Sequence, residues 1–356
     1  MDNCDPKKLA EFLCVSRNLR EIAKHFSLSE EMVQKLLLKK IEGYNLFPAK
    51  DRDGQMIYRL APEPPAKTVA PKIWYYDVAK DETGASQPYI QVVVSDDLPA
   101  KKLKIYPFGD IHYGAFGHDE GAFRAYLKLL LEKDHAFFVI IGDVIENALA
   151  SSIGGSVYEQ VMPPHAQVLS IREILRPIAH KCFAALPGNH EERSLKLANI
   201  DPLEFGVCDN LGIPYFSEPV YLDVLWRGNV FTFFIQHGKS GAQTKGGKLN
   251  AASRPLLTNE HTMFTVMGHV HDLTSGKNVK RCREFVRDKN GEVVNMRIVE
   301  RVEYVIICPA TYRFFSTYAS RAGYSPVAQS TVIACVLKED GTYYLDEKPL
   351  EIEKPQ

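Results

Sequence analysis

The residues of this sequence that could do chemistry are aspartates and histidines in short clusters between positions 110 and 271. Two of the histidines, His269 and His271, are one residue apart and follow a glycine and an apolar run. Because positions i and i+2 of an extended segment point to the same side, both rings could reach one charged centre. A lone His-x-His is more often a hydrogen-bonded pair at a strand end, so the other clusters must decide.

Four further clusters precede this pair, and each follows a short apolar run that is typical of a buried strand. Singly, each is a common dipeptide or tripeptide with an ordinary structural role. Together, in one order and always after an apolar run, they indicate one shared site. The five clusters are Asp110-x-His112, Gly142-Asp143, Gly188-Asn189-His190, His237-Gly238 and Gly268-His269-x-His271.

This series resembles the motifs DxH, GD, GNH, an isolated H and GHxH of the calcineurin-like metallophosphoesterase superfamily, over residues 103–275. The resemblance implies an α/β fold, a four-layer αββα sandwich, that binds two divalent metal ions. It also implies the ligands. One ion would be bound by Asp110, His112, a bridging Asp143 and His271, and the second by Asp143, Asn189, His237 and His269.

The ligand types support two-metal chemistry in their own right. Carboxylates, imidazoles and an amide oxygen, without a thiolate, suit divalent ions, with manganese as our first expectation and zinc or iron as alternatives. Two ions about 3.5–4 Å apart can hold the attacking and leaving oxygens of a phosphoryl displacement, and can ionise a bridging water near neutral pH. A metal-bridged hydroxide would then be the nucleophile without a side-chain base.

The residues after Asn189 add two expectations. In the family, the position of His190 contacts the phosphate and donates a proton to the leaving alkoxide or stabilises the transition state, a role that suits an imidazole. The alternative is that His190 only hydrogen-bonds to a neighbouring ligand. Glu191 departs from the family pattern, which commonly has Asp at this position. The longer carboxylate would change the contact that this side chain makes.

Loops around the clusters are expected to select the substrate, because metal ions treat all phosphates alike. Asn147 lies in a long segment that could close over the site. A glycine-rich segment with Lys245 and Lys248 but no acid suits a phosphate chain, although a surface loop with solvated lysines is the alternative. Arg193 is a further candidate for a phosphate contact.

The clusters can meet only if a sheet brings them together. From residue 103, apolar runs alternate with helical patterns over residues 121–134 and 167–181, which predicts βαβ units with their polar strand ends at one edge. Strand-like runs over residues 295–310 and 330–347 are expected to complete a second sheet. Residues 287–294 read as a hairpin turn.

The first 60 residues have another pattern. Apolar residues recur at spacings of three and four over residues 6–47, and a hairpin pattern surrounds Asp53-Gly54. Ser27 and Glu30 read as a capping box that starts the third helix. This order of elements resembles a small winged-helix domain, which can bind DNA through its third helix.

Candidate DNA contacts on that helix are Lys35, Lys39 and Lys40. Residues 1–60 carry 11 Lys and Arg against 9 Asp and Glu, a weak excess for a DNA reader, so a protein-docking winged helix is the alternative. A Pro/Ala-rich linker over residues 61–72 then leads to a metallophosphoesterase domain over residues 73–356.

Composition bounds the remaining possibilities. With 43 basic and 44 acidic residues, no global field favours nucleic acid or membrane, so such binding requires local patches. Seven scattered cysteines without a C-x-x-C motif argue against a disulfide framework or a cysteine zinc site. An N-terminus without an apolar signal core, and no apolar run near the ~20 residues of a membrane span, predict a cytoplasmic protein without a membrane partner.

We therefore expect a two-metal phosphoester hydrolase that acts on DNA, as a nuclease or a DNA-end phosphatase. A phosphatase of phosphoproteins or small phosphomonoesters, with the N-terminal domain docking a protein, is the alternative. The intact ligand set argues against a third possibility, a non-catalytic scaffold. Oligomeric state is left open.

Overall fold

The computed structural model of the chain describes residues 8–9, 12–13, 17–37, 44–50, 56–62, 72–75, 79–80, 86–152, 157–258, 262–309, 311 and 331–352. All seven predicted metal ligands lie within these ranges, whereas Lys39 and Lys40 lie outside them.

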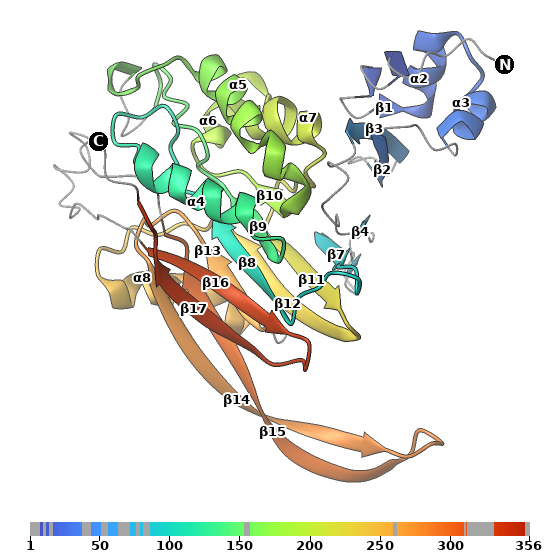
Figure 1. The fold of residues 1–356 in the computed structure, drawn as a ribbon, viewed down its shortest axis with the longest axis vertical. Helices are drawn as coiled ribbons and strands as arrows, with labels where there is room; N and C mark the ends of the chain where they lie inside the picture. Colours follow the sequence, from blue (N-terminus) through green and yellow to red (C-terminus); the bar gives the residue numbers. More distant parts are fainter. Residues whose placement is uncertain are drawn as a thin grey trace.

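Two β-sheets packed face to face form the core (Figure 1). Apolar side chains from both inner faces meet in one buried cluster, with Phe137 stacked on Phe183 in the first sheet and Phe233 on Phe264 in the second. The first sheet, in spatial order, consists of β10 (Cys182–Leu186), β9 (Ala136–Ile141), β8 (Lys102–Phe108), β16 (Thr331–Lys338) and β17 (Tyr343–Pro349). The second consists of β14 (Thr274–Arg287), β15 (Val293–Ile307), β13 (Phe264–Met267), β12 (Asn229–Gln236), β11 (Val220–Trp226), β7 (Tyr89–Val93) and β4 (Lys72–Tyr75).

Helices cover the outer faces of both sheets, which confirms the predicted four-layer arrangement. The first sheet is covered by α4 (Glu120–Glu132), α5 (Pro164–Leu175) and the 3-10 helix η2 (Arg176–Lys181). The second is covered by α8 (Lys245–Ser253) and the 3-10 helix η4 (Arg254–Leu257). The short helices η1 (Val157–Glu159), α6 (Glu191–Ala198), η3 (Glu204–Cys208) and α7 (Asp209–Leu211) complete this part of the chain.

The predicted βαβ units are present, because β8, α4 and β9, and then α5 and β10, follow one another with parallel strand pairs. Helix α4 begins where the Asp119 side chain accepts a hydrogen bond from the Ala122 N–H, and it buries Phe123, Tyr126 and Leu130 at helical spacing. Parallel strands of this kind place their carboxyl ends at one edge of the sheet.

The predicted hairpin turn is also confirmed. Strand β14 ends at Arg287 and β15 begins at Val293, and Gly291 closes the turn with a φ of 84°. The sequence patterns did not predict β14, whose residues are mostly charged or polar. Strands β14 and β15 continue well beyond the rest of the sheet as a two-stranded ribbon (Figure 1).

The N-terminal part contains helices α2 (Leu19–Phe26) and α3 (Glu30–Leu37) and a sheet of β1 (Arg17–Asn18), β3 (Met56–Pro62) and β2 (Tyr44–Lys50). The capping box predicted at Ser27 and Glu30 is wrong. Ser27 ends α2 in a left-handed conformation, and the Ser29 hydroxyl accepts the hydrogen bond from the Met32 N–H. Helices α2 and α3 precede the hairpin of β2 and β3, as predicted, whereas strand β1 was not predicted, and the assignment as a winged helix stays a prediction. Strands β5 (Ala79–Lys80) and β6 (Ser86–Gln87) form a separate small sheet.

Among the helices of the described ranges, none has the length and apolar character needed to cross a membrane.

Candidate metal centre

The predicted ligands lie on loops that directly follow strand ends in both sheets. The strand β8 leads to Asp110 and His112, β9 to Asp143, β10 to Asn189, β12 to His237, and β13 to His269 and His271. The sandwich therefore brings five segments that are far apart in sequence to one edge.

The backbone of these loops is strained at the ligands themselves. Asp110, His112, Asp143, His269 and His271 have φ values of 48°, 48°, 51°, 71° and 52°, a region that residues other than glycine rarely occupy. Such conformations persist only where the surroundings impose them, and they cluster at functional sites. Here the Asp143 carbonyl accepts hydrogen bonds from the N–H groups of Ile111 and His112, which fixes one loop against the other.

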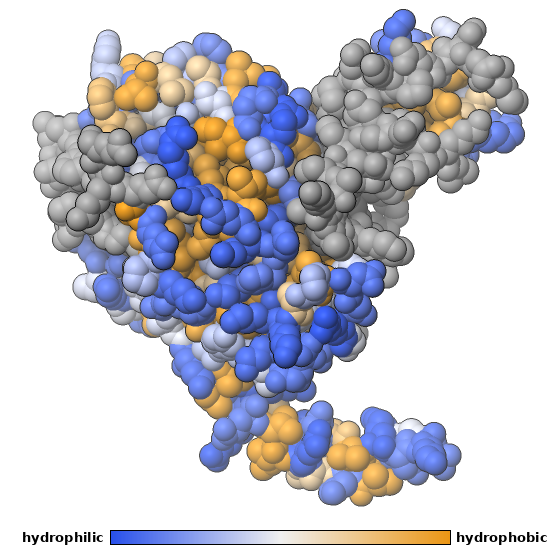
Figure 2. Space-filling view, viewed as in Figure 1, coloured by the Kyte–Doolittle hydropathy of each residue, from blue (hydrophilic) through white to orange (hydrophobic). Residues whose placement is uncertain are grey.

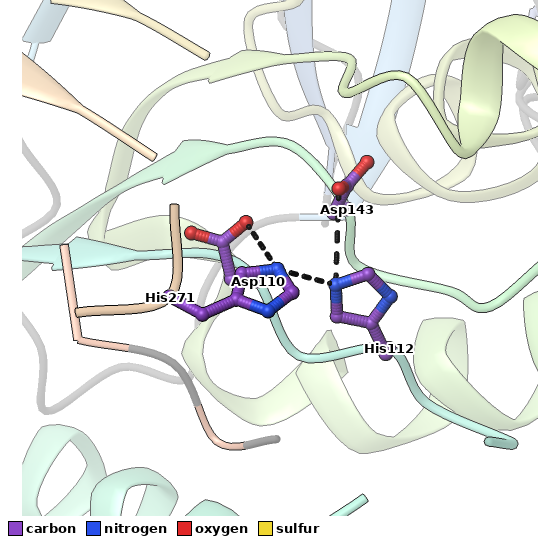
Figure 3. Close-up of side chains that lie close together, drawn as sticks. All are labelled: Asp110, His112, Asp143 and His271. Atoms are coloured by element: carbon purple, nitrogen blue, oxygen red, sulfur yellow. Dashed lines mark hydrogen bonds and ion pairs between the residues drawn. The ribbon is translucent and has the colours of Figure 1, made fainter. Parts of the chain in front are cut away.

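The first ligand group consists of Asp110, His112, Asp143 and His271, whose ligand atoms all lie within 4.8 Å of one another (Figure 3). Nε2 of His112 is 2.9 Å from Nε2 of His271, which in turn is 3.4 Å from Oδ1 of Asp110. All four side chains are buried. The four donors face a common point, as the sequence predicted for one metal ion.

The second ligand group shares Asp143 with the first and adds His237 and His269. Oδ1 of Asn189 is 2.8 Å from Nδ1 of His269 and 3.2 Å from Nε2 of His237. Oδ2 of Asp143 is 3.4 Å from Nε2 of His237. The structure thus brings all seven predicted ligands together, with Asp143 between two groups.

The charges of this centre fit divalent cations. Asp110 and Asp143 are 0% and 1% exposed, and within the described residues neither forms an ion pair with a lysine or arginine. Buried carboxylates require a compensating positive charge. Burial opposes their ionisation, but the neighbouring imidazoles of His237 and His112 hold the pKa of Asp143 well below its usual range. Against its own burial, the Asp143 charge raises the pKa of His237 to about 10.

Glu146 is a functional residue that the sequence did not single out. Its Oε2 is 3.1 Å from Nδ1 of His112, and the side chain is buried. A carboxylate that accepts a hydrogen bond from the outer nitrogen of a histidine fixes the ring and leaves the inner nitrogen free to bind a metal. The available signal was an acid three residues after Asp143, which says nothing about where the side chain points.

Glu191 joins the loop after β9 to the loop after β10. Its carboxylate accepts hydrogen bonds from four backbone N–H groups, namely those of Gly188 at 2.8 Å, Asp143 at 2.9 Å, Val144 at 2.8 Å and Ile145 at 3.2 Å. Burial and the nearby Asp143 charge raise the pKa of Glu191 to about 7. The glutamate that departs from the common family pattern is therefore a structural link between two ligand loops.

The close approach of these loops also explains why residue 188 is a glycine. A Cβ atom at Gly188 would overlap with the carboxylate of Asp143. Only a glycine lets the backbone after β10 lie against the shared ligand.

His190 lies beside the first ligand group, with its ring centroid 4.3 Å from that of His112. Its Nδ1–H donates to the Glu146 carbonyl at 2.7 Å, and its Nε2 accepts a hydrogen bond from Nη2 of Arg193 at 3.0 Å. Burial is the main cause that lowers the pKa of His190 to about 3, so the ring is neutral. The structure places His190 and Arg193 together at the centre, and their roles towards a phosphate stay predictions.

The other predicted substrate contacts have protein partners. Asn147 is fully buried, and its Nδ2 donates to the His190 carbonyl at 2.7 Å and to the Ser194 hydroxyl at 3.0 Å. The segment with Lys245 and Lys248 forms helix α8 rather than a loop. Lys245 is exposed at its first turn, whereas Nζ of buried Lys248 is 3.2 Å from Oδ2 of Asp272.

Of the predicted DNA contacts, Lys35 is described and exposed. Its Nζ forms an ion pair at 2.8 Å with Glu31 on the same helix.

Comparison with known families gives one match, in which a family model described as calcineurin-like phosphoesterase covers residues 103–297. A comparison with curated proteins finds no match.

Proposed function

Since this chain belongs to the calcineurin-like phosphoesterase family and is a metal-dependent phosphoester hydrolase, we propose that it uses two divalent ions to hydrolyse phosphoesters of DNA. The observation that carries the two-ion proposal is the position of Asp143, which is a member of both ligand groups. Oδ2 of Asp143 lies 3.7 Å from Nε2 of His112 and 3.4 Å from Nε2 of His237, so this carboxylate would hold two cations close together, as two-metal phosphoryl chemistry uses them.

The ligand sets follow from the two groups. Asp110, His112 and His271 would hold one ion, and Asn189, His237 and His269 the other, with Asp143 bridging them. When bound, two such ions supply Lewis acidity at the phosphoryl oxygens and acidify a water that acts as the nucleophile. Oxygen and nitrogen donors without a thiolate favour manganese, with zinc or iron as alternatives.

Protein groups complete the site. Arg193 is positioned by His190 and by the Glu146 carbonyl, to which its Nη1 donates at 2.9 Å. We assign its guanidinium to the phosphate, because this group matches phosphate geometry and keeps its charge. His190 is assigned to the leaving oxygen, to which its imidazole can deliver a proton once Nε2 has exchanged its hydrogen bond from Arg193 for a proton.

DNA is our first choice of substrate, supported by the predicted winged helix and by an excess of basic residues on the ribbon of β14 and β15. One observation favours the alternative, a phosphatase whose N-terminal domain docks a protein. Recognition helices contact DNA through their first turns, but the first turn of α3 carries Glu30 and Glu31. Because these carboxylates would repel phosphates, the described part of α3 is poorly suited to contact DNA.

A panel of metals and substrates tests the proposal. Metal-free protein would be supplied with Mn²⁺, Zn²⁺, Fe²⁺ or Mg²⁺ and assayed on end-labelled single- and double-stranded DNA, 3′-phosphorylated DNA, cyclic nucleotides and a phosphopeptide. We expect manganese-supported cleavage or end-dephosphorylation of DNA. Turnover of the phosphopeptide alone would overturn the DNA proposal in favour of the alternative.

A further inference from the structure

The ribbon of β14 and β15 is an element that the metal centre does not use. Strand β14 lies at the edge of the sheet, and β13 pairs only with residues 304–307 of β15. Residues 278–303 therefore form a two-stranded arm whose base contacts the body through Lys280 and Val302 and whose outer part stands clear of it (Figure 1). A ribbon of two strands buries little surface and is marginally stable by itself, so an arm of this length indicates a binding partner.

One face of the arm carries exposed apolar side chains beside arginines, since the register places Arg283 directly opposite Ile298. Phe285, Met296 and Ile298 lie on this face and are 55%, 46% and 66% exposed, although the register places Phe285 directly opposite Met296. Figure 2 shows hydrophobic residues among hydrophilic ones on the projecting arm. Large apolar groups gathered on a thin exposed element mark a contact surface rather than a core.

The arm is also the place where the basic residues of the chain are in excess. Residues 274–307 contain eight of the 43 Lys and Arg residues of the chain but five of its 44 Asp and Glu residues. Three of those acids already form ion pairs, Glu284 with Arg297, Glu300 with Arg281, and Glu303 with Lys280. In the described part of the chain, no ion pair is formed by Lys277, Arg283, Arg287, Lys289 or Arg301.

Cross-strand register adds a second indication of an anionic partner. Arg301 lies directly opposite Lys280, and like charges at opposite positions destabilise a ribbon. Glu303 lies 2.9 Å from Lys280 and offsets part of this repulsion. An external anion beside Arg301 would remove the remaining repulsion.

We propose that the arm binds duplex DNA, with the ribbon in a groove, its cations that lack an ion pair on the phosphates, and its exposed apolar side chains against the sugars and bases. A two-stranded ribbon fits the major groove, and basic ribbons with apolar side chains are one established way to hold a duplex. This inference rests on the proposed DNA substrate. A second copy of the chain is the less suited occupant, because two arms with excess positive charge would repel each other.

Strand β14 begins near the metal centre, since Thr274 follows His271 by three residues, and it runs away from the centre along the sheet into the arm. The 14 residues of β14 extend about 48 Å at a strand rise of about 3.4 Å per residue. That length corresponds to about 14 base pairs at about 3.4 Å each. A duplex can contact the centre and the full length of β14 together only if it exceeds this length, so the arm adds affinity for long substrates.

Binding to a duplex without metal tests the inference. The full-length protein in EDTA would be titrated with a fluorescent duplex of about 30 base pairs over a series of salt concentrations. The arm variant carries Lys277→Gln, Arg283→Gln and Arg301→Gln, and the matched control carries Lys101→Gln, Lys102→Gln and Lys133→Gln on the body. We expect the arm variant to bind at least tenfold more weakly, with the salt slope reduced by about 2–3, and the control to match the wild type.

Two further measurements separate the possible failures. Ile298→Ser should weaken binding about fivefold without changing the salt slope, because it removes an apolar contact. With metal restored, the arm variant should cleave a duplex of about 8 base pairs as fast as the wild type does. On long DNA it should cleave more slowly than the wild type.

If the wild type acts on DNA but the arm variant binds like the control, the arm inference is overturned and the proposed function stands. If the wild type neither binds nor cleaves DNA, both fall. A wild-type dimer that Ile298→Ser dissociates, with duplex binding unchanged, would assign the arm to a second copy and overturn the inference.

Discussion

The carboxylate of Glu146 lies 3.1 Å from Nδ1 of His112, on the side of the ring that faces away from Nε2 of His271. This contact holds the proton on Nδ1 and keeps Nε2 available as a metal donor. Glu146 is thereby a positioning residue for one ligand group, and it does not contact the second group.

Replacing Glu146 with Gln is expected to lower the affinity of one metal site about tenfold, since loss of an outer hydrogen-bond partner typically costs about 10–100-fold. The affinity of the second site should not change. Calorimetric titration of the metal-free protein measures both sites, with Glu132→Gln on the exposed surface of α4 as the control. Equal weakening of both sites would contradict the positioning role.

Glu191→Ala is expected to lower the free energy of unfolding by about 3–5 kcal/mol, because four buried N–H groups lose their acceptor. Glu191→Asp keeps the charge but shortens the reach, so a loss of about 1–2 kcal/mol is expected. Urea denaturation in EDTA measures both variants without a contribution from bound metal. A neutral effect of Glu191→Ala would show that these hydrogen bonds are not needed to hold the two loops together.

His190→Gln should bind metal as the wild type does but lose about 10²–10⁴-fold in turnover, the usual contribution of a positioned proton donor. Metal content and kcat on one phosphodiester measured in the same preparation distinguish the two effects. Unchanged turnover would leave His190 only its contacts with Arg193 and with the Glu146 carbonyl.

His180 provides a pH-dependent test of stability away from the metal centre. Burial lowers the pKa of His180 to about 4, and its Nε2 has no hydrogen-bond partner in the described structure. In the unfolded chain the pKa is about 6.5, so the unfolded state gains a proton first as the pH falls. This residue therefore lowers stability progressively from pH 6.5 to pH 4.

His180→Phe should remove that part of the acid sensitivity. Urea denaturation of both proteins in EDTA at a series of pH values measures the difference in free energy of unfolding. The gap should move in favour of the variant below pH 6.5 and level off near pH 4. A gap that does not depend on pH would contradict the buried, neutral state of His180.

Sequence patterns could predict the sheet and its ligands because both depend on local order. Each ligand directly follows an apolar run, so the position of Asp110 or Asp143 at a strand end can be read without knowing the neighbouring strands. Glu146 and Glu191 are different, because their partners are set by how two loops approach one another. The sequence drew attention to Glu191, but four backbone donors at one carboxylate appear only in three dimensions.

Strand β14 and helix α8 are two elements that the sequence patterns did not predict. Strand β14 is rich in charge because it has no core to face, so it lacks the apolar alternation that identifies a strand. Lys248 sits in a glycine-rich stretch that suggested a loop, yet a Thr244 cap and the packing of Ala252 against the second sheet make it helical. Pairing with β15 in the first case and packing against the sheet in the second outweighed local propensity.

The central claim is that one carboxylate, Asp143, serves two metal ions. It is tested most directly by counting the divalent ions that bind per chain in the wild type and in Asp143→Asn, with folding of both checked by circular dichroism. We predict two ions for the wild type, and at most one weakly bound ion with no phosphodiesterase activity for the variant. A folded Asp143→Asn protein that still binds two ions and keeps full activity would contradict it.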